Sequence, residues 1–229
     1  MSNPIDGGDV DDAITAVEPH LQPALLANAL RAGRLPSDHL FDRLLPRELR
    51  LASVVHFTPL VVAQRAAAWF DELGVRSVVD IGSGAGKFCV AAALCSRAHY
   101  FGLEQRRSLV VTARELARTF DVQRRVTFVH ATFGVGQTPI PTADAYYLFN
   151  PFGENVYDTP DHLDDEVELS DARYVRDVYA VESLLEELPA GTYLLTFNGF
   201  GGQVPPTWRE LRVDDTLPNV LRLWRKAAL

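Results

Sequence analysis

Apolar residues in the first part of the chain recur at spacings near three and four, as one face of a helix requires. Between Asp12 and Leu51 this set comprises Ile14, Val17, Leu21, Leu25, Leu26 and Leu30. Prolines at positions 19, 23, 36 and 46 interrupt the pattern, so it predicts several short helices. We therefore expect a helical N-terminal cap over residues 12–59, preceded by a flexible tail at residues 1–11, which are polar, acidic and contain two adjacent glycines.

From residue 60 onward, helical periodicity alternates with short apolar runs. Helices are expected at 60–73, 86–95, 108–120 and 171–188, and strands at 77–81, 99–103, 125–130, 143–149 and 192–197. This alternation predicts an α/β fold whose mostly parallel sheet is covered by helices on both faces. Two last strands, at 210–213 and 220–224, are separated by Asp214, Asp215 and Pro218. They predict a C-terminal antiparallel hairpin.

Composition narrows the class of protein. The 229 residues are 47% hydrophobic, which suffices for one sizeable core. A formal net charge of -8 makes a nucleic-acid partner less favoured, since gripping phosphates requires a basic surface. The two cysteines and six histidines match no metal-ligand spacing, so no metal site is expected. The chain shows neither a signal peptide nor a bilayer-spanning run, which predicts a cytoplasmic protein without membrane association.

The most informative segment is the glycine-rich stretch from Val78 to Phe88, V-V-D-I-G-S-G-A-G-K-F. An apolar strand ends near Asp80 and enters a turn containing Gly82, Ser83, Gly84 and Gly86, after which a helix begins. Glycines let the backbone turn sharply and approach a ligand closely. In open α/β sheets, ligands bind at the carboxyl ends of the strands. We therefore expect a ligand against this turn.

Three functions or structures of this turn can be considered, and two of them are tested by the spacing of its residues. A P-loop requires G-x-x-x-x-G-K-[ST], but Phe88 stands in place of the hydroxyl residue. A dinucleotide fingerprint requires G-x-G-x-x-G, whereas the third glycine here comes one residue early. A carboxylate before the loop would also repel a pyrophosphate. A tight turn without a ligand is the third alternative.

An acid also ends the next predicted strand, at Glu104 in the segment Phe101-Gly-Leu-Glu104. A carboxylate at this position can accept hydrogen bonds from both ribose hydroxyls of a nucleotide-like ligand. A favourable charge at the N-terminus of the following helix is the plainer alternative. The position one strand after the glycine turn favours ribose binding.

The segment Val78–Phe88 closely resembles the first motif of class I S-adenosylmethionine-dependent methyltransferases, and the resemblance extends over roughly residues 60–229. It implies a Rossmann-like, cofactor-binding methyltransferase domain over residues 60–229, with S-adenosyl-L-methionine as cofactor. The carboxylate of Asp80 is then expected to help hold the cationic methionine part, and Glu104 the ribose. Many members carry an acid for adenine after the third strand; this chain has none there, so Thr132 or a backbone amide is expected instead.

Asn150, Pro151, Phe152 and Gly153 follow the fourth strand and partly resemble the [ND]-P-P-[YFW] motif of amino-methylating members. The resemblance implies that Asn150 accepts a hydrogen bond from the target nitrogen while the ring of Phe152 packs on the target. The second proline of the motif is missing, and a simple Asn-Pro turn is the alternative. We expect Asn150, Pro151 and Phe152 to form the catalytic site, with Asn150 also near the cofactor.

Acidic residues are dense between Glu154 and Asp171. They predict either a solvated loop leading into a helix N-terminus or a lid that attracts a cationic small molecule or a basic protein segment as methyl acceptor. The runner-up functions are a cofactor-binding pseudoenzyme or regulatory module, and a nicotinamide-dependent oxidoreductase. The sequence does not identify the acceptor: a protein side chain, a small amine and an RNA base remain open.

Overall fold

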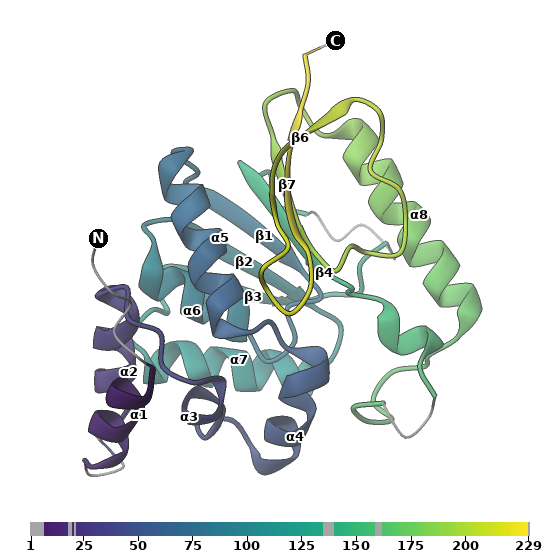
Figure 1. Cartoon of the computed structure of the whole chain (residues 1–229). Helices are drawn as coiled ribbons and strands as arrows, with labels where there is room; N and C mark the ends of the chain where they lie inside the picture. The colour runs from purple at the N-terminus through teal and green to yellow at the C-terminus, as the bar shows by residue number, and fades with distance from the viewer. Residues whose placement is uncertain (1–6, 18–19, 21, 135–139, 159–161, 229) are drawn as a thin grey trace.

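The computed structural model describes residues 7–17, 20, 22–134, 140–158 and 162–228. Within them, the strands form one sheet in the order β3-β2-β1-β4-β5-β7-β6 (Figure 1). The strands are β1 (Ser77–Ile81), β2 (His99–Glu104), β3 (Val126–His130), β4 (Ala145–Phe149), β5 (Tyr193–Phe197), β6 (Trp208–Asp214) and β7 (Leu221–Lys226). The first five are parallel, and β7 pairs antiparallel with both β5 and β6. The predicted mixed sheet with a terminal hairpin is confirmed.

Helices cover both faces of this sheet, because its strands are apolar on both sides. The helices of this part are α5 (Leu60–Glu72), α6 (Lys87–Cys95), α7 (Arg107–Thr119) and α8 (Asp171–Glu187). Side chains of α5, α6 and α7 pack with Val78 and Tyr100 of the sheet, whereas α8 packs with Val79 and Tyr146 on the opposite face. Figure 1 shows α5 and α6 on one side of the sheet and α8 on the other.

The N-terminal segment is helical, as expected: α1 (Gly7–Thr15), α2 (Gln22–Arg31), α3 (Asp38–Asp42) and α4 (Arg47–His56). The flexible tail predicted at residues 1–11 is wrong from residue 7 onward, since α1 begins there; residues 1–6 lie outside the described residues. The reason is that Val10 and Ile14, four residues apart, are both buried in the core. The polar composition concealed this apolar pair.

Lys87, the first residue of α6, joins the cap to the glycine turn. Its Nζ lies 2.6 Å from Asp38 and 2.8 Å from Asp42, and it donates to Ser53 Oγ at 3.1 Å. Lys87 is only 2% exposed, so this cation would be costly without its partners. The cap is therefore fastened directly to the first helix after the glycine turn.

Within the described residues, no single helix is long and apolar enough to span a bilayer. Taken together, α4 and α5 are long and apolar enough, but the two helices are bent by 61° relative to each other.

Candidate active site

A cleft opens at the carboxyl ends of β1, β2 and β4. The chain leaves β1 toward β2 and β3 and then returns to place β4 beside β1, so this edge is the switch point of the sheet, where ligands bind in such folds. The cleft has a volume of about 1090 Å³, including its open mouth. Seven of the residues that line it were expected at the site from the sequence: Gly82, Gly84, Glu104, Thr132, Asn150, Pro151 and Phe152.

The glycine turn is packed from two directions by the neighbouring loops. Gly82 has φ +79°, and a Cβ there would lie 2.8 Å from Cβ of Pro151. Gly84 has φ +54°, and a Cβ there would lie 3.0 Å from the ring of Phe57, which belongs to the segment between α4 and α5. The glycines thus allow the turn after β1, the Asn-Pro turn after β4 and the end of the cap to meet at one place.

Gly86 and Ser83 belong to the same turn but do not line the cleft. A Cβ at Gly86 would lie 2.8 Å from Cβ of Ala113 and also collide with Phe128, so the missing side chain serves helix and sheet packing. Ser83 is buried and borders a small cavity beside the cleft rather than the cleft itself. Of the four turn residues expected to bind the cofactor, Gly82 and Gly84 line the cleft and Ser83 borders the adjoining cavity; their part in binding stays a prediction.

Asp80 borders the same small cavity and is only 3% exposed. Its carboxylate accepts a hydrogen bond from the thiol of Cys89 at 3.4 Å. Burial raises the pKa of Asp80 to about 7; the Cys89 hydrogen bond opposes this rise and the nearby Glu104 charge adds to it. No cation is paired with Asp80 among the described residues, so a positively charged ligand group would stabilise its ionised form.

Glu104 is held rigidly at the end of β2. One carboxylate oxygen accepts from the backbone N–H of Gly84 and the other from that of Arg106, both at 2.8 Å. Burial raises the pKa of Glu104, while these two hydrogen bonds lower it. Each carboxylate oxygen can accept a further hydrogen bond, as two ribose hydroxyls would require.

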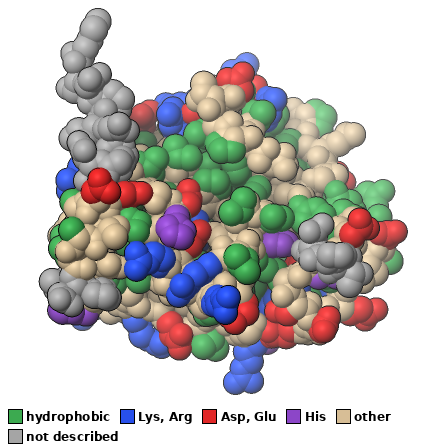
Figure 2. Space-filling model, turned by 60° about the horizontal axis from the view of Figure 1, so that its bottom comes forward, with side chains coloured by type: hydrophobic (Ala, Val, Ile, Leu, Met, Phe, Trp, Pro, Cys, Tyr) green, Lys and Arg blue, Asp and Glu red, His purple; other side chains and the backbone are tan. Residues whose placement is uncertain are grey.

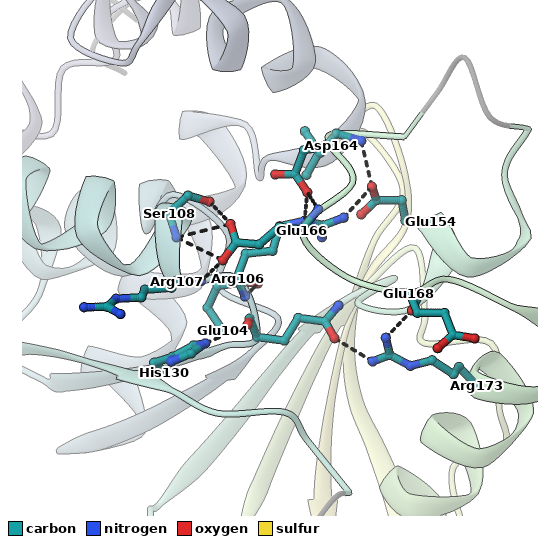
Figure 3. Close-up of polar contacts among 12 residues, drawn as sticks. Glu104, Arg106, Arg107, Ser108, His130, Glu154, Asp164, Glu166, Glu168 and Arg173 are labelled. Atoms are coloured by element: carbon teal, nitrogen blue, oxygen red, sulfur yellow. Dashed lines mark hydrogen bonds and ion pairs between the residues drawn. The ribbon is translucent and has the colours of Figure 1, made fainter.

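Arg106 ties the acidic linker after β4 to the end of β2 (Figure 3). Its side chain is 3% exposed and forms ion pairs with Glu154 at 2.8 Å and Asp164 at 2.7 Å. These pairs raise the pKa of Arg106 although burial alone would lower it. Glu166 accepts hydrogen bonds from the backbone of Arg107 and from the hydroxyl of Ser108, at the start of α7.

Glu154 and Asp164 are therefore paired with a buried arginine, and the exposed Glu166 is bonded to the start of α7; neither predicted form of this segment anticipated these contacts. We call residues 162–170, together with Glu154, the strap. Leu163 and Leu169 of the strap line the cleft. The strap supplies an apolar wall beside Arg106.

Asn150 adopts a positive φ of 39° directly after β4. Its backbone N–H donates to the carbonyl of Gly199 at 2.9 Å, and its side-chain Nδ2 donates to the hydroxyl of Tyr157 at 3.0 Å. A short 3-10 helix, η2 (Gly153–Val156), brings Tyr157 back over Asn150. Gly153 permits this because a Cβ there would collide with the Asn150 side chain.

The two other residues expected at the catalytic site also line the cleft, but their exposure differs. Pro151 is half-buried against Gly82. Phe152 is 6% exposed and stacks with Phe133 at 6.0 Å between ring centroids. Thr132 lies at the end of β3 in the wall of the cleft.

Several residues of the site were missed by sequence reasoning. The cleft is also lined by Arg106, Glu154, Tyr157, Leu163, Leu169, Asp177 and Asn219. The signal that could have pointed to Arg106 is charge: with Arg107 it forms an arginine pair shortly after the β2 acid, in a chain whose later linker is rich in carboxylates. Tyr157 carried no comparable signal.

Within the part of the chain that the structure describes, no group of three or more His, Cys, Asp or Glu side chains could hold a metal ion.

Solved structures of methyltransferases resemble this chain in fold. An RNA methyltransferase from Salinibacter ruber, in complex with S-adenosyl-L-homocysteine, has a TM-score of 0.53 and 21% identity, over 75% of this chain and 94% of the other. An O-methyltransferase from Bacillus cereus, in complex with the same compound, has a TM-score of 0.55 and 11% identity, over 88% and 97%. The mitomycin 7-O-methyltransferase has a TM-score of 0.54 and 17% identity, over 99% and 74%.

No protein-family model matches the sequence, and no curated protein matches it. At these low identities the likeness concerns the fold. The strand order, the C-terminal antiparallel hairpin and the cleft at the switch point agree with it. The chain therefore has the Rossmann-like fold of the class I S-adenosylmethionine-dependent methyltransferases.

Proposed function

We propose that the protein is an S-adenosylmethionine-dependent methyltransferase whose acceptor atom, a nitrogen, is held at Asn150. The observation that carries this proposal is the meeting of the glycine turn and the Asn-Pro turn, where Gly82 lies against Pro151. A cofactor held along Gly82 and Gly84 would then have the Asn150 side chain at its reactive end. The similar structures in complex with S-adenosyl-L-homocysteine support the choice of cofactor.

The residues present fit this cofactor. Glu104 would accept from the ribose hydroxyls, and the buried carboxylate of Asp80, with which no cation pairs among the described residues, would favour the cationic methionine part. Leu163, Leu169 and Thr132 offer apolar and hydroxyl contacts for adenine in place of the missing acid. We propose that residues 60–229 form the cofactor-binding domain and that the cap over residues 12–59 closes it through Phe57 and Lys87.

The chain's own part in the reaction is alignment. When bound, S-adenosylmethionine supplies an electrophilic methyl: the acceptor lone pair bonds to the methyl carbon, the pair of the broken C–S bond stays on the now neutral sulfur, and the nitrogen releases one proton to solvent. Asn150, fixed by Tyr157 through its Nδ2, presents Oδ1 to an acceptor N–H. Holding the acceptor in line in this way contributes several kcal/mol, about the size of other positioning effects.

The test is methyl transfer from tritiated S-adenosylmethionine to cell lysate separated into protein, RNA and small-molecule fractions. We expect label in one fraction with the native protein. With Asn150→Ala, label should fall at least about tenfold while S-adenosylhomocysteine affinity stays nearly unchanged. Full transfer by folded Asn150→Ala protein would mean that the segment is only a turn. Binding without transfer in any fraction would favour the cofactor-binding module.

The expectation of a cationic acceptor rested on a free acidic lid. Of its acids, Glu154, Asp164 and Glu166 are engaged by Arg106 and the start of α7, so these three are not free to attract a cationic acceptor. The RNA and small-molecule methyltransferases among the similar structures leave the acceptor's class to the assay.

A further inference from the structure

The charged side chains that line the cleft are all engaged by the protein itself. Glu104 accepts from two backbone N–H groups, and Glu154 accepts from Arg106 and from the backbone of Leu163. Asp177 accepts from Arg176 at 2.6 Å and 2.8 Å. Arg106 is paired with two carboxylates, those of Glu154 and Asp164. Among the described residues of the lining, no carboxylate or guanidinium is left without a partner to recognise a charged acceptor.

The end of α4 forms one side of the cleft mouth and is apolar. Val54 and Val55 line the cleft, and they are 90% and 50% exposed. Leu51, three residues before Val54 and so on the same helix face, is 80% exposed. We call Leu51, Val54 and Val55 the α4 patch. Exposed apolar clusters of this kind at a cleft mark binding surfaces.

The α4 patch is held in place from behind. Ser53 on the buried side of α4 is 2% exposed and accepts a hydrogen bond from Lys87, which in turn pairs with Asp38 and Asp42 of α3. At its end, His56 lies 6.1 Å from the Tyr157 ring, between centroids, and Tyr157 is bonded to Asn150. The patch is thus continuous with the acceptor position through two aromatic rings.

Hydrophobic side chains also reach the surface on this side of the molecule. Figure 2 brings the lower side of Figure 1 forward and shows hydrophobic side chains at the surface between charged ones. An apolar molecule would gain by covering the patch.

We infer that the methyl acceptor is an uncharged, largely apolar small molecule, an amine of the aromatic type, whose nitrogen lies at Asn150 and whose body covers the α4 patch. This inference rests on the proposed function. An aromatic amine keeps its lone pair at neutral pH, whereas an ammonium must first lose a proton. An uncharged acceptor therefore needs no carboxylate in the acceptor part of the cleft.

The probes are the two isomeric amines of tetralin. One carries its amino group on the aromatic ring and is uncharged at neutral pH; the other carries it on the saturated ring and is protonated. Calorimetry in the presence of S-adenosylhomocysteine should show the uncharged isomer binding at least about tenfold more tightly. Val54→Glu should weaken that binding about tenfold and leave S-adenosylhomocysteine affinity unchanged. Val175→Glu, at an exposed apolar position on α8 outside the cleft, is the matched control and should change neither.

Equal or preferential binding of the protonated isomer overturns the inference, as does failure of both isomers to bind at millimolar concentration. If Val54→Glu leaves amine binding intact but turns a dimer into a monomer by sedimentation, the patch is covered by a second copy and the inference also fails. In each case normal S-adenosylhomocysteine binding leaves the proposed function standing, whereas its absence in the native protein removes the proposed function itself.

Discussion

The side-chain Nδ2 of Asn150 donates a hydrogen bond to the hydroxyl of Tyr157 at 3.0 Å. An amide has one donor end and one acceptor end, and in this arrangement the donor end points to Tyr157. Tyr157 thereby leaves Oδ1 of Asn150 to accept from an acceptor N–H. Tyr157 is a positioning residue in this account, acting through Asn150.

Tyr157→Phe should lower kcat about two- to tenfold, corresponding to about 0.5–1.5 kcal/mol for one neutral hydrogen bond. KM for S-adenosylmethionine and the melting temperature should stay nearly unchanged, because the ring and its packing remain. Steady-state kinetics on the acceptor found in the lysate assay measures this. Tyr179→Phe, on an exposed tyrosine of α8, is the control. Equal kcat in the two variants would remove Tyr157 from the mechanism.

Lys87→Met should lower the free energy of unfolding by about 3–5 kcal/mol, because the buried carboxylate of Asp42 loses its cation. Asp42→Asn in the same chain should recover part of that loss, since it removes the unpaired charge. Chemical denaturation of the two single variants and the double variant gives the coupling free energy. Additive losses would show that the cap is not fastened through this pair.

Arg106→Gln should free the strap, because Glu154 and Asp164 lose their common partner. Hydrogen exchange of residues 162–170 should become faster, and the affinity for S-adenosylhomocysteine should fall, since Leu163 and Leu169 would no longer be held in the wall of the cleft. Arg107→Gln is the matched control, because Arg107 is exposed and takes part only through its backbone N–H. Unchanged exchange in Arg106→Gln would mean that other contacts hold the strap.

Affinity for S-adenosylmethionine should depend on pH through Asp80. Its pKa is raised to about 7 by burial, so below pH 7 the protein without cofactor carries Asp80 protonated. A cationic ligand favours the ionised form, so binding must then release a proton. The dissociation constant should rise toward tenfold for each pH unit below 7 and level off above it. Burial raises the pKa of the neighbouring Cys89 thiol well above its usual value, so the thiol stays neutral throughout.

Calorimetry between pH 5.5 and 8.5, about 1.5 pH units on each side of that pKa, checks this dependence. Asp80→Asn should bind more weakly at pH 8 and show no such dependence. A dissociation constant that does not change with pH in the native protein would mean that Asp80 does not interact with the cationic part of the ligand.

The sheet could be predicted from the sequence because its strands are continuous apolar runs between clear turn signals. β1 is found at the predicted residues 77–81, and the other boundaries shift by at most two residues. The glycine turn and Asn150 could be predicted because each follows a strand whose carboxyl end must face the cleft. These are local patterns, which a single sequence carries.

The contacts that complete the site are between distant parts of the chain. In the sequence, Lys87 stands at the lysine position of an incomplete P-loop motif. Its partners Asp38 and Asp42 lie far away in the chain, in the cap, so the pairing could not be predicted. The composition of residues 154–166 is that of a solvated loop, and it does not show that Arg106 pairs with Glu154 and Asp164. Composition reports charge but not which distant residue neutralises it, and this is why the strap was not predicted.

Binding of S-adenosylmethionine in the cleft through the glycine turn and Glu104 is measured directly by calorimetric titration with S-adenosylhomocysteine and with NAD. We expect the native protein to bind S-adenosylhomocysteine and not NAD, and Glu104→Ala to lose about 1–3 kcal/mol of binding free energy from unpairing buried polar groups. Binding of NAD without any response to S-adenosylhomocysteine would contradict this expectation.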